Sequence, residues 1–472
     1  MKVSYVNYKN LDYGMRLDAE YYKPGFLAIE KKLKAINCIP LNDVSESIKS
    51  FGAYALCNQM VLVEQGIPFI RCKDIQEGFV DFSEVLFIDK PTHTLLSKSA
   101  VTPNVVMLGM SGTVGTSAIA NPHWQYPINS NQDIAKIITN EKVNPYYLSI
   151  FFNTKYGKTQ TKRLPVGSIQ QHIFIWQLKK LLIFCPSQLF QKFIERLYHR
   201  AIVLLKDSQN DYSQAEQILL TDLNLLNWKP KHRLSFVKNY SDIQTASRID
   251  AEYFQPKYED IVKEIKEYKE GYGLLGELVS IKDKNIVPED ESVYKYIELA
   301  NISINGNITG FTEALGHELP TRARRKVRTG DVIVSSIEGS LSSIALINGP
   351  LNNALCSTGF YVIDSEAMNS ETLLVFLKSK AGQLQLKKGC SGTILTAIGN
   401  GELKKVIFPK ISGKIQDIIK TKITEMYKAK AVSDELLNIA KRGVELAIEK
   451  DEPQAQKWIN DELNRIGITI SK

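Results

Sequence analysis

The chain has 472 residues, of which 44% are hydrophobic and 23% are charged, and it contains 28 Gly and 17 Pro. Because domains usually hold about 100 to 200 residues, this length predicts two to four domains and excludes a mini-protein. The composition excludes collagen-like and largely disordered chains. No apolar run approaches the ~18 residues that span a bilayer, and the first residues include Lys, Asp and Tyr where a secretory signal is apolar. We therefore expect a cytoplasmic protein without a membrane partner.

Cysteine, histidine and charge narrow the possible ligands. The six Cys and six His are dispersed without a C-x-x-C pair, which favours free thiols and surface imidazoles over a zinc site. The 59 basic and 51 acidic residues give a net charge of +8. Residues 1–234 hold 27 basic and 19 acidic residues, whereas residues 235–472 hold 32 of each, so the whole excess lies in the first half. This balance permits an anionic partner such as a nucleic acid.

One segment near the N-terminus occurs again in the middle of the chain. Arg16-Leu-Asp-Ala-Glu-Tyr-Tyr-Lys-Pro24 returns as Arg248-Ile-Asp-Ala-Glu-Tyr-Phe-Gln-Pro256, a shift of 232 positions. The pattern predicts two copies of one module of about 230 residues. Further pairs keep this order while the shift falls to 225: Asn7-Tyr8 with Asn239-Tyr240, Gly112-Thr113 with Gly339-Ser340, Gly157 and Gln160 with Gly382 and Gln385, residues 166–169 with 391–394, residues 178–180 with 403–405, and Gln191 with Gln416.

Each copy is expected to begin with a helix and to continue as short strands. A Pro opens an amphipathic pattern at 26–36 and again at 258–268. Strand-like runs broken by turns follow, together with short helices at 145–156 and 370–381, and this mixture indicates an α+β fold. The predicted strands are 67–71, 85–88, 105–108 and 134–138 in the first copy, and 293–297, 332–334 and 360–363 in the second.

Each copy ends in a Pro-containing strand and a long helix. The strands are expected at 181–186 and 406–409, and Ser187 or Ser412 can cap the helix that follows. The first helix would be ~60 Å long, so we expect the two helices to pair as a coiled coil, with a helix lying on its own domain as the alternative. Apolar residues recur at steps of three and four along both helices, at 190, 194, 197, 201 and 204 and at 415, 419, 423, 426 and 429, with 436, 440, 444 and 447 as an extension.

In their order and their duplication, these features resemble the specificity (S) subunit of type I restriction-modification systems. The resemblance covers essentially the whole chain. It implies a tandem pseudo-repeat of two mixed α/β target recognition domains, joined by two long helices in an antiparallel coiled coil. The implied division is a conserved N-terminal segment at 1–35, recognition domain 1 at 36–184, a central conserved region with a long helix at 185–268, recognition domain 2 at 269–409, and a distal conserved region with a long helix at 410–472.

The resemblance also implies a function. Each recognition domain would read one half of a bipartite site in double-stranded DNA, and the helices would space the domains and dock other subunits. The implied partners are methyltransferase (M) subunits, two of them, and restriction (R) subunits, which would bind S-adenosylmethionine and ATP with Mg. This chain itself would hold no cofactor, no metal and no catalytic residue.

Candidate DNA contacts are Lys, Arg and small polar residues near turns, because these donate to phosphates and base edges. The densest run is residues 321–328, with five basic residues in seven positions and no acid, although a solvated basic surface is the alternative. The candidates in the first copy are Lys49, Tyr54, Arg71, Lys73, Ser111, Thr113, Lys162, Arg163, Ser168, Gln170, Gln171 and His172. Those in the second copy are Lys282, Lys284, Arg322, Arg324, Arg325, Lys326, Ser340, Ser342, Lys387, Lys388 and Thr393.

The charged residues of the duplicated segment form a separate class. Arg16, Asp18 and Glu20 return as Arg248, Asp250 and Glu252. Paired carboxylates can act in catalysis, but salt bridges at the start of a helix and subunit docking are the favoured interpretation, because the segment lies just outside the variable part of each copy.

Enzymatic interpretations find weaker support in the sequence. Asn121-Pro122-His123-Trp124 approaches the catalytic loop of DNA adenine methyltransferases, yet His stands where a second Pro is needed. Gly109, Gly112 and Gly115 do not form a dinucleotide-type turn, and Glu264 with Lys266 fits the solvated face of a helix better than a nuclease site. A self-contained adenine methyltransferase of atypical motif and a DNA-free assembly scaffold stay as alternatives.

Overall fold

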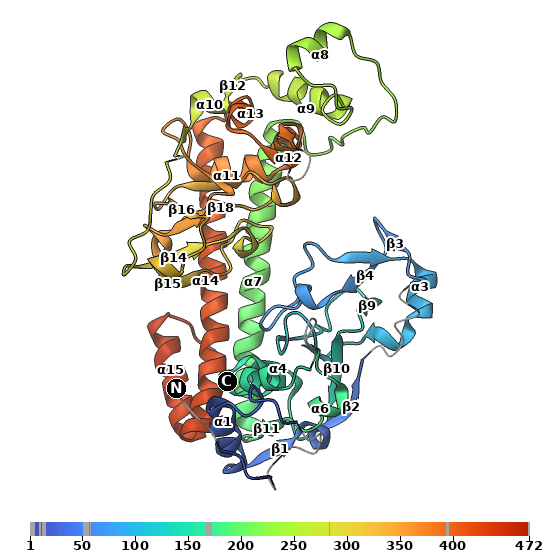
Figure 1. The fold of residues 1–472 in the computed structure, drawn as a ribbon, viewed down its shortest axis with the longest axis vertical. Helices are drawn as coiled ribbons and strands as arrows, with labels where there is room; N and C mark the ends of the chain where they lie inside the picture. Colours follow the sequence, from blue (N-terminus) through green and yellow to red (C-terminus); the bar gives the residue numbers. More distant parts are fainter. Residues whose placement is uncertain are drawn as a thin grey trace. The chain divides into compact units, whose positions relative to one another are not determined.

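The computed structural model describes residues 5–8, 11, 16–50, 56, 58–166, 172–282, 284–392 and 396–470. The chain divides into two compact units: residues 1–205 with 430–472 form unit 1, and residues 206–429 form unit 2. The division falls inside two long helices, α7 (Gln188–Asp222) and α14 (Gly413–Glu449), both drawn in Figure 1. Each unit therefore contains one copy of the β-rich module and one part of each long helix.

Unit 1 contains two sheets and a strand pair. The four-stranded sheet has the order β2-β10-β7-β8, the five-stranded sheet has the order β3-β5-β4-β9-β6, and β1 pairs with β11. Its elements before α7 are α1 (Pro24–Lys34), β1 (Cys38–Pro40), β2 (Ser45–Lys49), β3 (Leu62–Val63), β4 (Ile67–Ile70), β5 (Leu86–Ile88), α3 (Lys90–Leu95), β6 (Ala100–Val101), β7 (Val106–Gly109), β8 (Ser117–Ile119), β9 (Ile128–Ser130), β10 (Ile134–Thr139), α4 (Pro145–Asn153), α5 (Lys155–Arg163), α6 (Ile175–Leu178) and β11 (Leu182–Phe184). The helix α15 (Glu452–Arg465) completes this unit after α14.

Unit 2 contains two four-stranded sheets, in the orders β13-β20-β17-β18 and β15-β14-β19-β16, and the pairs β12–β23 and β21–β22. Its elements between the long helices are α8 (Tyr240–Ala246), α9 (Pro256–Lys266), β12 (Tyr272–Leu274), α10 (Leu275–Leu278), β13 (Ser280–Ile281), β14 (Val293–Ile297), β15 (Thr312–Leu315), β16 (Ala323–Lys326), β17 (Val332–Ser335), β18 (Ile344–Leu346), β19 (Leu355–Ser357), β20 (Phe360–Asp364), α11 (Ser370–Lys378), α12 (Lys380–Lys388), β21 (Cys390–Ser391), β22 (Ala397–Ile398), α13 (Asn400–Lys404) and β23 (Ile407–Pro409).

The two units share most of their strand pairings, and β3 is an additional strand of unit 1. In unit 1, β4 runs parallel to β9 and antiparallel to β5, and β9 runs antiparallel to β6. In unit 2, β14, β19, β15 and β16 repeat these pairings in the same roles. The predicted tandem repeat and the mixed α/β fold are therefore confirmed, whereas the predicted domain boundaries stay predictions.

The polar residues that recur in the sequence have equal structural tasks in both units. The Gln160 side chain accepts from Leu182 N and donates to Leu182 O, at 2.9 and 3.0 Å, and Gln385 does the same with Ile407, at 2.8 and 3.0 Å. A buried amide that satisfies both backbone groups of one strand residue fixes that strand against the helix. Gln191 at the start of α7 accepts a hydrogen bond from the backbone amide of Asn144, the residue before α4. Gln416 of α14 does the same with Asn369, the residue before α11.

The single helices expected at 145–156 and 370–381 are each two helices, so those boundaries were wrong. Thr154 and Ser379 end the first helix and cap the second by accepting from the amides of Gly157 and Gly382, at 3.2 and 3.5 Å. A Cβ on either glycine would lie 2.4 Å from a carbonyl oxygen of the preceding helix. The close approach of the two helices explains why glycine recurs here.

The long helices carry the expected apolar stripes. Ser187 caps α7 by accepting from Phe190 N at 3.3 Å. In unit 1, Ser433 Oγ of α14 donates to Ala201 O of α7 at 2.7 Å, and further along the pair Gly443 faces Ile194, so the helices run antiparallel. In unit 2, Lys422 of α14 binds Asp211 of α7 at 3.1 Å. Most stripe residues are buried, with Leu204, Ile415 and Ala429 half-buried.

Each long helix also lies on a domain, so the alternative interpretation holds for part of its length. In unit 1 the ring of Tyr198 on α7 lies 5.2 Å from that of Tyr146 on α4. The stripe is shared between the partner helix and the domain core. Within the described ranges, no helix combines the length and the apolar character that crossing a bilayer requires.

Candidate nucleic-acid interface

The duplicated segment forms a braced site in unit 1. The Arg16 guanidinium donates to Asp18 through Nε at 2.8 Å and to the carbonyl oxygen of Leu164 through Nη1 at 2.9 Å, and it covers the ring of Tyr21 at 4.5 Å. Arg163 covers the same ring at 3.9 Å and donates to Tyr21 O. Hydrogen bonding from Arg16 holds the pKa of Asp18 below its usual value. The segment is therefore fixed to the end of α5.

Unit 2 repeats this bracing. Arg248 donates to Asp250 and to the carbonyl oxygen of Cys390, at 2.8 and 2.9 Å, and covers the ring of Tyr253 at 4.4 Å. Lys388 takes the place of Arg163, 5.0 Å from that ring. Burial lowers the pKa of Lys388, and hydrogen bonding from Arg248 lowers that of Asp250. The structure therefore contains the ion pairs that the sequence analysis favoured for these residues.

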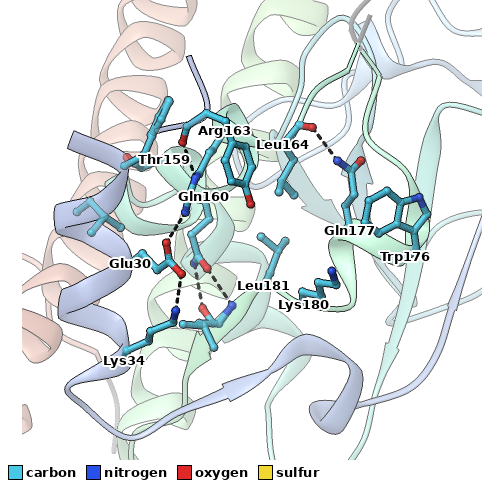
Figure 2. Close-up of a pocket in the computed structure, with 14 residues that line it drawn as sticks. Glu30, Lys34, Thr159, Gln160, Arg163, Leu164, Trp176, Gln177, Lys180 and Leu181 are labelled. Atoms are coloured by element: carbon cyan, nitrogen blue, oxygen red, sulfur yellow. Dashed lines mark hydrogen bonds and ion pairs between the residues drawn. The ribbon is translucent and has the colours of Figure 1, made fainter. Parts of the chain in front are cut away.

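A pocket of about 240 Å³ opens beside the braced site of unit 1, between α1, α5 and α6 (Figure 2). Phe26, Leu164 and Trp176 supply apolar walls. Three of its charged side chains bind one another: Arg163 pairs with Glu30, and Glu30 also pairs with Lys34. Lys180 also lines the pocket and lies over the ring of Trp176. A pocket whose charged side chains contact other lining residues offers a ligand shape and apolar surface more than a reactive group.

A different pocket, of about 430 Å³, adjoins the braced site of unit 2. Its lining includes Arg248, Glu252, Glu338, Lys387 and Lys388. Glu252 is bound by Tyr258 and Lys257, so the carboxylate pair of the duplicated segment is committed to contacts inside the framework. Glu20 pairs with Lys23 at the same place in unit 1.

Many of the residues predicted to contact DNA make contacts within the chain. Lys282 shows this clearly: burial opposes its charge, but hydrogen bonds to Asp331 and Asp364 outweigh burial and raise its pKa. The other members are Arg71 with Asp74 and the carbonyl oxygen of Glu84, Thr113 with the carbonyl oxygen of Cys72, Arg163 with Glu30, Arg325 with the carbonyl oxygen of Phe360, Ser340 with Ser335, Lys388 on Tyr253, the buried Ser111, the half-buried Ser342, and His172 at 3.5 Å from Asp133.

A smaller set of predicted contacts is open to solvent. Lys73 is exposed and pairs with Glu84 at 3.2 Å, while Arg324 is half-buried and donates to Thr321 O. The other exposed members are Lys49, Lys162, Lys284, Arg322, Lys326 and Lys387. Tyr54, Ser168, Gln170, Gln171 and Thr393 lie outside the described residues.

Four of the predicted cations of unit 2, three exposed and one half-buried, gather at one sheet edge. The strand β16 ends the order β15-β14-β19-β16, and the backbone of residues 285–286 pairs with it through Ile286 N and Arg324 O at 2.8 Å. Lys284 therefore lies next to β16, which carries Arg324 and Lys326 and directly follows Arg322. In the described part of the chain, none of these four cations forms an ion pair. We call them the basic edge.

Among its described residues, unit 1 has no equally basic strand at this sheet position. The strand in the same sheet position is β6, whose residues are Ala100 and Val101, with Lys98 before it. The basic edge is therefore a property of the second copy alone. Because a row of unpaired cations along an exposed edge suits a polyanion, this is the best-formed candidate contact with nucleic acid.

The sequence did not predict the roles of Glu77 and Lys136. Glu77 binds both Lys158 of α5 and Lys441 of α14, which lie far from it in sequence, and burial lowers the pKa of both lysines. Lys136 on β10 is only 5% exposed and donates to Ser130 Oγ at 2.9 Å. Spacing in the sequence gives no signal for either, because their partners come from other elements.

The motif at residues 121–124, which approaches a methyltransferase loop, has a structural role. Asn121 accepts from His123 N at 2.9 Å, and Trp124 packs on Phe82, so this motif is a turn over a core cluster. In the described ranges no three His, Cys, Asp or Glu side chains are placed to hold a metal ion. Five of the cysteines are described, and all five are free thiols.

Comparison with known proteins finds solved structures from type I restriction-modification systems. The chain is similar to the S subunit of a type I restriction-modification system from M. genitalium, with 14% identity, a TM-score of 0.40, and coverage of 87% of this chain and 96% of that one. It is similar to the HsdS subunit from Thermoanaerobacter tengcongensis, with 13% identity, a TM-score of 0.29 and coverage of 88% and 97%. The chain is also similar to a chain from a structure that describes the assembly of a type I restriction-modification complex. The identity is 13%, the TM-score is 0.30, and the match covers 88% of this chain and 98% of that one.

These structures come from the family that the sequence resembles. No protein-family model and no curated protein matches the chain.

Proposed function

We propose that this chain is the DNA-specificity subunit of a type I restriction-modification complex. Each β-rich domain would read one half of a bipartite site in double-stranded DNA, and catalysis would belong to methyltransferase and restriction subunits that this chain positions. Its own role would be to select the adenine that the methyltransferase modifies.

The duplication carries this proposal. Two domains with shared strand pairings and different edges are suited to two half-sites of different sequence. The shared residues, such as Gln160 and Gln385, hold the framework. The residues that differ include the basic edge and its counterpart β6. A framework kept in both copies, with distinct edges, is what two readers of different sequences require.

Methylome sequencing tests the proposal. The chain is co-expressed with its methyltransferase partner in a host that lacks other adenine methylation, and residues 36–184 are then replaced by the same segment of another S-type chain. The expected result is a bipartite methylated motif in which only one half changes and the gap stays. Replacement of residues 269–409 should change the other half.

Two outcomes would overturn the proposal. If neither half of the methylated motif changed after either replacement, the domains would not read the DNA sequence, and the chain would be an assembly scaffold. S-adenosylmethionine binding and methylation by the isolated chain would show instead that it is a methyltransferase in its own right.

A further inference from the structure

The strand β16 has an irregular pairing at Arg324. Ala323 lies opposite Ser357 of β19, and the next pair joins Arg325 to Cys356. No residue of β19 therefore opposes Arg324. Such a β-bulge can re-aim the side chain of the extra residue, and bulges are common beside functional sites. In the first copy, the strand in the same sheet position, β6, pairs with β9 without a shift of register. The bulge is therefore a difference between the copies at the edge where they also differ in charge.

Arg324 is held in place by two hydrogen bonds. Its carbonyl oxygen accepts from Ile286 N at 2.8 Å, and its Nε donates to the carbonyl oxygen of Thr321 at 3.0 Å. The residue is half-buried. Among the described residues, its two Nη groups have no hydrogen-bond or ion-pair partner. A guanidinium whose Nε is fixed aims the N–H donors of its Nη groups in one direction, as a preorganised planar fork.

The other cations of the basic edge are placed differently. Lys284, Arg322 and Lys326 are exposed, and exposed flexible cations suit phosphates, which lie along every duplex whatever its sequence. Arg325 is already committed, because it binds the carbonyl oxygen of Phe360. The basic edge thus contains one braced arginine among flexible cations. Phosphate contacts position a protein on DNA, whereas contact with a base needs a side chain of fixed direction.

A braced arginine fork has one best partner among the bases. Guanine presents two hydrogen-bond acceptors, O6 and N7, side by side on its major-groove edge, whereas adenine presents a donor beside its acceptor. Residues 285–286 and β16 are the two outermost strand segments at this edge of the sheet. The major groove is wide enough for two paired strands.

We infer that Arg324 determines specificity: its Nη groups donate to O6 and N7 of a guanine in the half-site that the second domain reads. Arg322 and Lys326 hold the flanking phosphates. The ligand, double-stranded DNA, is taken from the proposed function, on which this assignment of one residue to one base rests. The strand β6 of the first domain consists of Ala100 and Val101, so the first half-site is read by other groups.

Methylome sequencing of the complex with its co-expressed methyltransferase subunit tests this role of Arg324. Arg324→Ala should relax one guanine position, in the half of the motif that changes when residues 269–409 are replaced, and leave the other positions as they are. Arg324→Gln should shift that position toward adenine, because a glutamine amide pairs with adenine N6 and N7. The matched control is Arg322→Ala, which removes a nearby cation and should leave the motif unchanged.

Modified duplexes give a second measurement, which does not depend on a protein variant. Guanine is replaced by 7-deazaguanine, one position at a time, which removes the N7 acceptor and keeps base pairing. The intact complex should lose affinity by roughly three- to tenfold at one guanine of this half-site. The Arg324→Ala complex should lose no further affinity at the same guanine, whereas the Arg322→Ala complex should lose as much as the intact one.

Three results would overturn the assignment. It is wrong if the half of the motif read by the second domain contains no guanine, or if Arg324→Ala leaves every position of the motif fixed. It is also wrong if Arg324→Ala weakens binding to all duplexes equally, as Arg322→Ala should, because Arg324 is then a phosphate contact. Each of these results leaves the proposed function standing, since a bipartite motif is still present. Absence of any motif with the intact chain would contradict the proposed function itself, and this assignment with it.

Discussion

Lys136 is a buried cation. Among the described contacts, the one hydrogen bond of its ammonium group is to the Ser130 hydroxyl. Burial lowers its pKa from an ordinary 10.5 to about 8. In the unfolded chain the lysine keeps its proton up to about pH 10.4, so between these values the unfolded state binds more protons than the folded state. The folded state is therefore penalised below pH 8, and the penalty disappears as the pH rises.

We expect Lys136 to contribute an increase in the free energy of unfolding of unit 1 as the pH rises from 8 to 10. Lys136→Met should remove that contribution and stabilise unit 1 at pH 7 by roughly 1–3 kcal/mol, since a pKa shift of one unit corresponds to about 1.4 kcal/mol. Urea unfolding followed by hydrogen exchange of β10 measures both effects. The matched control is Lys49→Met, because Lys49 lies opposite Lys136 on β2 and is exposed. Equal pH dependence in the two variants would contradict this account.

Gln385 shows how a repeated residue acts. Its amide satisfies both backbone groups of Ile407 inside the core of unit 2. Gln385→Ala should lower the free energy of unfolding of unit 2 by roughly 2–4 kcal/mol, because two buried backbone groups lose their partner. Gln385→Glu keeps the acceptor for Ile407 N and loses the donor to Ile407 O. Hydrogen exchange of β23 should rise in both variants, and a rise in β11 of unit 1 instead would contradict the assignment.

At the scale of elements, the basic edge is expected to bind phosphates. Arg322→Glu with Lys326→Glu should weaken binding of the chain to its duplex and reduce the slope of log affinity against log salt by about 2, since each lost phosphate contact removes about one counterion. Arg325 is unsuited to this test, because its guanidinium binds the carbonyl oxygen of Phe360 and its loss would disturb the sheet.

The control for the basic edge is Lys263→Glu with Lys410→Glu, which changes the net charge equally at exposed positions of the same unit. An equal loss of affinity in the control would mean that the whole charge of the chain matters and the edge does not.

The apolar stripe of α14 can be tested by comparing a buried residue with its exposed neighbour. Ile419 is fully buried in unit 2, and Ile418 is 38% exposed. Ile419→Ala should lower the free energy of unfolding by roughly 2–4 kcal/mol, whereas Ile418→Ala should change it by less than about 1 kcal/mol. Thermal unfolding of the two variants measures the difference, and similar values would show that the seam does not hold unit 2 together.

Elements with strong periodicity could be predicted, and those fixed by single contacts could not. The strand at 293–297 was predicted with the observed bounds, and α7 was predicted from Ser187 because its stripe and its cap agree. The break between α4 and α5 was missed, because Thr154 and Gly157 act through a hydrogen bond that has no periodicity. Most of the predicted DNA contacts were basic residues near turns, and their internal partners, such as Asp331 for Lys282, come from distant positions.

At the scale of the whole molecule, repetition in the sequence assigns one long helix to each copy, but contacts divide the helices differently. Unit 1 takes the first part of α7 and the last part of α14, together with α15. Sequence similarity between copies cannot predict this division, because it depends on the contacts of each helix with the other copy's helix. The N-terminal and C-terminal parts of the chain therefore belong to one unit.

The C-terminal segment should accordingly stabilise the first copy and leave the second unchanged. Glu452 of α15 accepts from Ser187 N at 2.8 Å and also binds the Ser187 hydroxyl, so it holds the start of α7. Ala455, Ile459 and Leu463 are buried in the core of unit 1, and Ile459 packs against Gly443. Removal of three buried apolar side chains and a helix cap should cost several kcal/mol.

Truncation after Lys450 should therefore raise hydrogen exchange across residues 16–205 and leave residues 206–429 protected as in the intact chain. Truncation after Ile470 is the control, because it keeps α15 and the apolar residues that pack on the core after it, and it should leave both units unchanged. A rise in exchange over both units after the longer truncation would mean that the long helices transmit the loss, and that the chain unfolds as one cooperative body. A rise confined to unit 1 would show that the two copies fold as separate units although their helices are continuous.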